Sequence, residues 1–334
     1  MLPQEARDGV GQEAFVPPAY APAPLDLPHE LAASGWPDGV LPLIGNDGMD
    51  TVIGPLCELF CQAYPGLSFT LSLRGSATAM PALVAGASWF APMSRDPWTE
   101  DTQAYRRARG HDPWALRLGY TGHGPRTSAR TPPAMYVHAS NPLAGATLAQ
   151  LARVFTRGAA GGELSTWGQL GLEGAWRARR IHVYGMRDTK YARGLRHRHF
   201  AGLPYAARYE ALPSREDVIR AVAQDPYGIG AVGWVQAASI SDQVRVLALA
   251  GEPGRPFETP DLATIASGGY PLKAWVSLFL DLAPGQAVPA LLREFGRLAL
   301  SREGQRIIAA RTHEDEGYVP LCERDWRAQL RRLG

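Results

Sequence analysis

Two short loops carry most of the residues that could bind an anion. The first is Gly45-Asn46-Asp47-Gly48, and the second is Arg74-Gly75-Ser76-Ala77-Thr78, which brings two hydroxyl groups. Each loop precedes a segment with helical spacing, and the backbone N–H groups at a helix N-terminus, together with the helix dipole, favour an oxyanion. Arg95 or Arg187 could add a charged clamp with two parallel hydrogen bonds. Taken one at a time, these loops could equally be ordinary turns and caps.

The elements around these loops alternate between strands and helices. Residues 40–44 form a short apolar run, and residues 49–64 place apolar side chains at helical spacing. Residues 67–73 alternate apolar and polar side chains with the period of two that is typical of a strand, and a short helix follows the second loop. This order predicts an α/β architecture with a largely parallel sheet, in which ligands bind at the carboxyl ends of the strands.

The rest of the chain continues the alternation. We expect further strands at 135–138, 181–184, 229–235 and 244–249, a helix at 147–155, and one or two helices within 287–310. Thr147 stands where the N-cap of its helix is needed. The first forty residues contain six prolines after position 16, which predicts an extended arm.

Three segments, taken in order, resemble the ligand-binding lobe of the phosphate-binding proteins of ABC importers. They are GNDGM at 45–49, LRGSAT at 73–78 with its helix to Gly86, and APMSR at 91–95. The resemblance extends over roughly residues 40–322, through the segments VHASNPL at 137–143, TLAQL at 147–151, TWGQL at 166–170, DPYGIG at 225–230 and LSREGQ at 300–305.

The resemblance implies an α/β, two-lobed type 2 periplasmic binding protein fold with the ligand cleft between the lobes. It also implies a division of the chain. Residues 1–39 would be a Pro-rich N-terminal arm, residues 40–136 plus 236–334 the first lobe, and residues 137–235 the second lobe.

The same resemblance implies which residues bind the ligand. In the first lobe these are Asp47, Gly48, Met49, Ser76, Ala77, Thr78, Ser94 and Arg95, and in the second lobe they are Arg187, Asp188 and Thr189.

The chain departs from the family pattern at two places that bear on the ligand. The second-lobe clamp of the family has an arginine followed shortly by Ser-Gly-Thr, whereas residues 185–191 read GMRDTKY. Many members also use a carboxylate to accept the proton of hydrogen phosphate, and Ser94 stands at that position here. Asp47 or Asp188 could replace this carboxylate, or discrimination against sulfate could be weak.

The resemblance implies an exported solute-binding protein, periplasmic or secreted. As a monomer, it would capture phosphate or a related oxyanion for an ABC importer and its membrane subunits, without covalent chemistry. The altered clamp leaves an alternative open, in which a ligand-degenerate two-lobed protein acts in sensing, surface assembly or protein docking.

The loop at 119–126 is either a longer rim loop or a contact to a larger phosphorylated ligand. The basic cluster at 193–199 is either a solvated helix face or part of the anion cleft.

Composition argues against several other classes. Lys and Arg number 34 against 32 Asp and Glu, so the net charge of +2 gives no field of the kind that nucleic-acid binders use. The sequence contains no run of about 18 apolar residues that could span a membrane, and its first residues lack the pattern of a signal peptide. If the native protein is exported, we expect its signal to be missing from this sequence. We expect no metal, no cofactor and no enzymatic activity, because no nucleophile elbow, P-loop or metal-ligand spacing is present.

Overall fold

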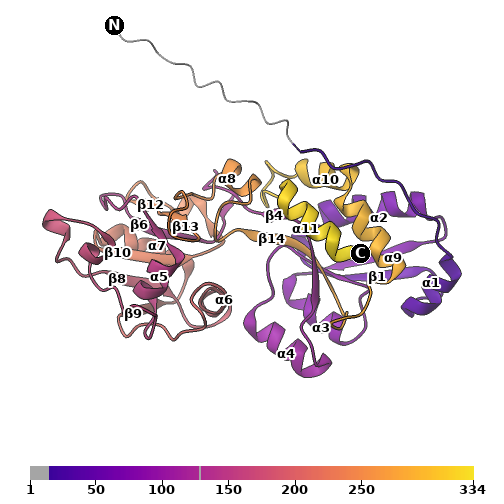
Figure 1. The fold of residues 1–334 in the computed structure, drawn as a ribbon, viewed down its shortest axis with the longest axis horizontal. Coiled ribbons are helices and arrows are strands. Elements are labelled where there is room, and N and C mark those ends of the chain that lie inside the picture. The colour runs from indigo at the N-terminus through magenta and orange to yellow at the C-terminus, as the bar shows by residue number, and fades with distance from the viewer. Residues whose placement is uncertain (1–14, 128) are drawn as a thin grey trace, which may run out of the picture.

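The computed structural model describes residues 15–127 and 129–334, which form two lobes joined by crossing strands (Figure 1). In the first lobe, β1 (Val40–Gly45) pairs in parallel with β2 (Ser68–Leu73). A second sheet has the strand order β15-β4-β14-β3. Its strands are β3 (Ala91–Met93), β4 (Trp114–Thr121), β14 (Ala274–Leu280) and β15 (Val319–Pro320).

Backbone hydrogen bonds connect the two sheets of the first lobe. The N–H of Trp89 donates to the carbonyl of Pro42 at 2.8 Å, and the N–H of Asn46 donates to the carbonyl of Pro92 at 2.9 Å. The expected largely parallel sheet is wrong for this lobe, because β14 runs antiparallel to both β3 and β4. The reason is topological: β14 returns from the second lobe and so enters the sheet from the opposite end.

Helices cover both sides of this layer (Figure 1). One group contains α2 (Asp50–Ala63), α9 (Ala290–Leu300), α10 (Arg302–Ala309) and α11 (Glu323–Leu333), and the other contains α3 (Ala79–Val84) and α4 (Thr99–Arg109). Phe295 of α9 is fully buried and lies 4.9 to 6.0 Å, between ring centroids, from Phe60, Phe69, Trp89 and Phe90. Tilted and edge-on contacts at such distances stabilise a core beyond the area that they bury.

The second lobe holds a five-stranded sheet in the order β12-β6-β10-β8-β9. Its strands are β6 (Ala134–His138), β8 (His182–Met186), β9 (Tyr209–Leu212), β10 (Gly228–Val232) and β12 (Val244–Val246), and its helices are α5 (Leu148–Phe155), α6 (Lys190–His199) and α7 (Arg215–Gln224). Because β12 hydrogen-bonds to β6, the sheet of this lobe draws on chain beyond residue 235, where the sequence predicted the lobe to end.

The lobes are joined where the chain crosses between them. There β5 (Arg130–Thr131) pairs antiparallel with β11 (Val235–Gln236). Next to the second lobe's sheet, β13 (Ala248–Ala250) pairs in parallel with β7 (Gly145–Thr147), and the short helix α8 (Leu262–Ala266) follows β13 in the chain. The lobes also touch away from these strands, since Arg193 Nη1 of α6 lies 3.0 Å from Glu100 Oε1 of α4.

The local sequence predictions are largely confirmed. The strands expected at 40–44, 67–73, 135–138 and 181–184 are present within one or two residues. Thr147 caps α5, because its hydroxyl accepts the N–H of Gln150 at 3.1 Å. The sequence analysis did not identify α1 (Leu27–Ser34), α4 or α11. Among the described residues, none of the helices has the length and apolarity that crossing a membrane requires.

The segment before β1 packs on the first lobe. Residues 27–34 form α1 where an extended arm was expected, and residues 15–26 run along α9 and α10 (Figure 1). The rings of Phe15 and Trp326 lie 5.0 Å apart. The buried carboxylate of Glu294 accepts the N–H of Ala23 at 3.3 Å and the hydroxyl of Tyr20 at 3.4 Å. A buried carboxylate needs such donors, so this segment is part of the lobe rather than a tether.

Removing residues 1–24 should therefore destabilise the protein. The truncation keeps α1 and its cap, Asp26, but takes two donors from Glu294 and uncovers Trp326. We expect the free energy of unfolding to fall by about 2–4 kcal/mol, from lost hydrogen bonds to a charged group and a lost aromatic contact. Urea denaturation measures it. A truncation of residues 1–14 alone is the matched control, against which the effect of removing residues 15–24 is measured. Equal stability of the two truncations would contradict the packing role.

Candidate anion-binding site

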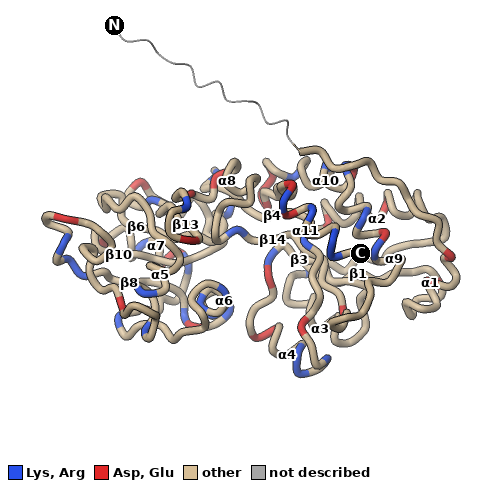
Figure 2. The backbone as a smooth tube through the Cα atoms, viewed as in Figure 1, with Lys and Arg blue, Asp and Glu red and all other residues tan. Residues whose placement is uncertain are grey.

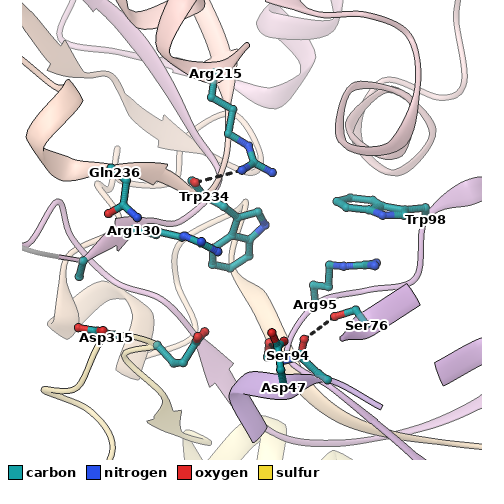
Figure 3. A pocket seen from close by; sticks show the side chains of 13 residues that line it. Asp47, Ser76, Ser94, Arg95, Trp98, Arg130, Arg215, Trp234, Gln236 and Asp315 are labelled. Atoms are coloured by element: carbon teal, nitrogen blue, oxygen red, sulfur yellow. Dashed lines mark hydrogen bonds between the residues drawn. The ribbon is translucent and has the colours of Figure 1, made fainter. Parts of the chain in front are cut away.

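A cavity of about 360 Å³ lies between the lobes, where the loops after β1, β2 and β3 face the crossing strands (Figure 3). The first lobe contributes polar, charged and aromatic side chains from these loops and from the loop before β15. The second lobe and the crossing strands contribute two arginines, an indole and an amide. The lining residues that carry the argument are Asp47, Ser76, Ser94, Arg95, Arg130 and Arg215, with Trp98, Trp234, Gln236, Asp315 and Glu316 around them.

The amide of Asn46 ties three loops together at the floor of this cavity. It lies 2.6 Å from the hydroxyl of Ser76 and 2.8 Å from the hydroxyl of Ser94. With its oxygen turned toward Ser94, the amide also accepts the N–H of Gly48 and donates to Asp47 Oδ1, both at 3.2 Å. Asn46 and Ser94 are buried, so these bonds fix both hydroxyls in place. The first-lobe half of the site is therefore held before any ligand arrives.

Three arginines reach the cavity without a carboxylate partner. Arg95 stacks at 4.0 Å on the ring of Trp98, and its Nη1 donates only to the carbonyl of Asp96. Arg215 donates to the carbonyl of Trp234 at 3.4 Å. Within residues 15–127 and 129–334, neither of these arginines nor Arg130 forms an ion pair. Cations that face a cavity without an ion-pair partner can hold an oxyanion through charge-assisted hydrogen bonds.

Burial lowers the pKa values of two of these arginines, Arg95 and Arg215. Partial burial lowers the pKa of Arg95 to about 10. The nearby charge of Asp101 opposes this shift, and that of Arg198 acts in the same direction as burial. Partial burial likewise lowers the pKa of Arg215, with Arg130 adding to the effect. Both groups remain charged at neutral pH, so the protein bears the cost of desolvating them. An anion in the cavity would offset this cost.

Carboxylates line the opposite side of the same cavity. Asp47 follows β1, and Asp315 and Glu316 come from the loop before β15. Burial of its carboxyl group raises the pKa of Glu316. The charge of Arg130 opposes this shift, and the charges of Asp47 and Asp315 add to it. The carboxyl group of Glu316 lies against Gly48, where an added methyl group would come within 2.7 Å of Oε1. A bare dianion would be repelled here, whereas a ligand that carries a proton could donate it to these groups.

The other first-lobe residues that the sequence predicted to bind the ligand do not line the cavity with their side chains. Met49 is fully buried in the core. Ala77 does not line the cavity, and the hydroxyl of Thr78 donates to the carbonyl of Gly75 at 2.8 Å. Gly48 lies beside the cavity wall under Glu316. Any contact from these four positions to a ligand would have to use backbone N–H groups.

The second-lobe residues expected to clamp the ligand lie apart from this cavity. Arg187 and Thr189 line a different hollow of about 320 Å³, which shares Trp98 and Arg215 with the first. Asp188 forms an ion pair with Arg196 of α6 at 3.0 Å and does not line the first cavity. The structure therefore brings Asp47, Ser76, Ser94 and Arg95 together and leaves 187–189 outside.

Sequence reasoning missed several residues of the cavity. Arg215 is the first residue of α7, and its helix start is marked by Ser214, whose hydroxyl accepts the N–H of Asp217 at 3.0 Å. That capping signal was available in the sequence. Arg130, Asp315 and Glu316 carry no local signal, because only the crossing of the chain brings them to the cleft.

The loop after β4 holds one wall of the site in place. Arg126 donates to the carbonyls of Glu314 at 2.8 Å and Asp315 at 3.1 Å. This loop therefore supports the acidic wall of the cavity. In the part of the chain that the structure describes, no group of three or more His, Cys, Asp or Glu side chains is arranged to hold a metal ion.

Comparison with known proteins bears on this architecture. No family model matches the chain. Over 329 residues the chain is 27% identical to the phosphate-binding protein PstS of Pseudomonas aeruginosa strain PAO1, covering 96% of this chain and 95% of that protein. The same values hold for PstS of strain UCBPP-PA14. The crystal structure of PstS from Borrelia burgdorferi matches with a TM-score of 0.51 at 15% identity, covering 84% of this chain and 98% of that one.

These likenesses confirm two expectations from the sequence. The expected two-lobed α/β fold is confirmed by the solved structure, and the resemblance to phosphate-binding proteins is confirmed by the two curated relatives.

The raised pKa of Glu316 predicts a pH-dependent effect of Glu316→Gln on stability. A carboxyl group whose pKa is raised in the folded state opposes folding when it is ionised, and it has no such effect below its ordinary pKa of 4.5. We expect the variant to be more stable than the wild type at pH 7.5 and this difference to disappear as the pH falls to 4.5. Urea denaturation at several pH values measures it.

Glu252→Gln provides the control, since Glu252 is exposed and has no ion pair among the described residues. It should show no such trend with pH. A Glu316→Gln protein that is less stable than the wild type at pH 7.5 would mean that the carboxylate has a stabilising partner.

Proposed function

We propose that this protein captures phosphate or a related oxyanion between its lobes and delivers it to the membrane subunits of an ABC importer. The observation that carries the proposal is the cluster of arginines without carboxylate partners beside two fixed hydroxyls in one interlobe cavity. Charged donors of this kind are costly to desolvate unless an anion meets them. Binding alone accounts for this arrangement, so we propose no covalent step and no enzymatic activity.

The relatives support the same proposal. The P. aeruginosa proteins are named as phosphate-binding proteins, and the similarity covers nearly the whole of both chains. Proteins of this class act outside the cytoplasmic membrane, so we propose a periplasmic or secreted location. We further propose that the protein acts as a monomer, since one chain supplies both lobes and the whole cavity.

The proposed ligand contacts come from both lobes. Ser76, Ser94 and Arg95 belong to the first lobe, Arg215 begins helix α7 of the second lobe, and Arg130 lies on a crossing strand. An anion that meets all of these groups at once would favour close approach of the lobes. A ligand can shift a conformational equilibrium only by binding one state more tightly, and contacts from both sides of a cleft meet that requirement.

The acidic wall supports selectivity for a protonated oxyanion. Hydrogen phosphate carries a proton that Asp47 or Glu316 can accept, whereas sulfate at neutral pH has none to give. Sulfate would therefore leave a carboxylate facing an anion without a hydrogen bond between them. We propose that these two carboxylates take the role that Ser94 cannot fill.

A second function remains a candidate because of the displaced clamp. Arg187, Asp188 and Thr189 do not line the cavity with Ser76, and three carboxylates do. A two-lobed protein that no longer binds an oxyanion, and that acts in sensing, surface assembly or protein docking, would also show this arrangement. Anion binding in solution separates the two.

Calorimetric titration with phosphate, sulfate and glycerol 3-phosphate tests the proposal. We expect phosphate to bind and sulfate to bind more weakly. Ser76→Ala should weaken phosphate binding by about 1–3 kcal/mol, because a hydrogen bond to a charged group is lost. Arg95→Gln should weaken it at least as much, since it removes a buried positive charge.

Arg187→Ala is the informative comparison, because Arg187 was expected to clamp the ligand and lies in the other hollow. Unchanged phosphate affinity in this variant would assign the second-lobe contact to Arg215. Absence of binding by all three anions to the wild type would refute the proposal and favour the ligand-degenerate alternative.

A further inference from the structure

A second, smaller cavity adjoins the anion-binding cavity. Its volume is about 150 Å³, and it shares Arg95, Trp98 and Trp234 with the first cavity. Its remaining walls come from α6 of the second lobe and from residues 271–275, which lead into and begin β14. The shared residues make the two cavities neighbouring chambers of one cleft. We call them the first and the second chamber.

The second chamber is lined by three cationic side chains, none of which forms an ion pair with a carboxylate among the described residues. Arg95, Arg198 and Lys273 line it, and its one carboxylate, Asp96, is already paired with Arg117 at 2.8 Å. Lys273 Nζ donates only to the carbonyl of Gly268, and the structure shows no side-chain hydrogen bond from Arg198 in the residues it describes. Figure 2 shows that basic residues are concentrated along α6, on the side of the second lobe that faces the first lobe.

Neutral polar groups in the second chamber also lack partners. Tyr191 lines the chamber and is buried, with only 6% of its surface exposed. Its hydroxyl has no hydrogen-bond partner among the described residues. Burial lowers the pKa of His199 to about 4, with Arg198 adding to the shift, so this histidine is neutral at physiological pH. An uncharged imidazole and an unpaired hydroxyl can accompany the cations in holding an anion. A buried hydroxyl without a partner is uncommon and requires an explanation.

Two indoles stand where the chambers meet. Trp98 carries Arg95 on its face, and Trp234 lies in the chain between β10 and β11. Trp234 has a backbone φ of 59°, in the left-handed region that a bulky residue rarely adopts. Strain of this kind persists where the surrounding structure requires the residue to stay. Here it keeps an apolar wall between two polar chambers.

We infer that the ligand of this cleft carries two anionic groups, one held in each chamber, with Arg95 between them. The inference rests on the proposed anion-binding function and narrows its substrate class to diphosphate-like compounds or phosphate esters with a second anionic group. One inorganic phosphate ion can occupy only one of the two chambers. It would leave the part-buried Lys273 and the buried hydroxyl of Tyr191 without an anionic partner, and the exposed Arg198 at the rim available for a second group. A second anionic group meets all three.

Titration calorimetry with inorganic diphosphate and inorganic phosphate tests the inference on the intact protein. A buffer without divalent cations avoids complexes of diphosphate. We expect diphosphate to bind at least about tenfold more tightly than phosphate, the value of one additional charge-assisted hydrogen bond. The comparison uses only the wild-type protein, so it does not depend on whether a variant folds. Titration with 3-phosphoglycerate and glycerol 3-phosphate then distinguishes a second phosphate from a carboxylate as the second group.

Substitutions in the second chamber test whether it is responsible for the tighter binding of diphosphate. Arg198→Gln and Lys273→Met should each remove most of the advantage of diphosphate and leave the affinity for phosphate within about threefold of the wild type. Arg220→Gln is the control, because it removes one positive charge from an exposed pair with Asp217 on the outside of α7. It should affect both ligands equally and weakly.

The outcomes separate this inference from the proposed function. If phosphate binds and none of the compounds with two anionic groups binds more tightly, the inference is wrong and the proposed function stands. If diphosphate binds more tightly but Arg198→Gln and Lys273→Met keep its advantage, the second chamber is not the site. If no anion binds at all, both the inference and the proposed function are wrong.

Discussion

The site depends on one constraint, the positive charge of arginines that face the interlobe cavity without forming an ion pair in the part of the chain that the structure describes. Arg198 of the second lobe lies close enough to Arg95 of the first lobe to contribute, after burial, to the lowered pKa of Arg95. The charge of Arg130 likewise adds to the effect of burial in lowering the pKa of Arg215. Like charges across a cleft oppose its closing, and an anion between them reverses the sign of the interaction. The cations therefore link ligand binding to the distance between the lobes.

The two halves of the site differ in how firmly they are held. In the first lobe, Asn46 joins the hydroxyls of Ser76 and Ser94, and both Asn46 and Ser94 are buried. This half needs no reorganisation to receive an anion, which lowers the cost of binding. In the second lobe and the crossing strands, Arg130 and Arg215 have few contacts of their own and can adjust to a ligand. This difference suits a protein whose ligand first binds to the first lobe, after which the second lobe closes over the ligand.

Local patterns in the sequence predicted the part of the site that is local in the chain. Period-two and helical spacing placed β1, β2 and their following helices, and the loops between them supplied Asp47, Ser76, Ser94 and Arg95. The acidic wall and the second-lobe arginines could not be predicted in this way. Arg215 and Glu316 are about a hundred residues apart and meet only because β14 and the crossing strands fold the chain back. The resemblance led to Arg187 as the second-lobe clamp, whereas Arg215 is the second-lobe arginine that lines the cavity with Ser76.

The backbone at Trp234 explains how the crossing strands keep these distant groups in register. Its N–H donates to the carbonyl of Thr131 at 2.8 Å, next to Arg130, and its carbonyl accepts from Arg215. One residue thus fixes the strand that carries one arginine and receives the side chain of another. A conformation with positive φ costs roughly 1–3 kcal/mol for a residue other than glycine. The two hydrogen bonds and the indole wall offset that cost only while β5 and β11 stay paired, so the paired crossing strands and the charged cleft stabilise each other.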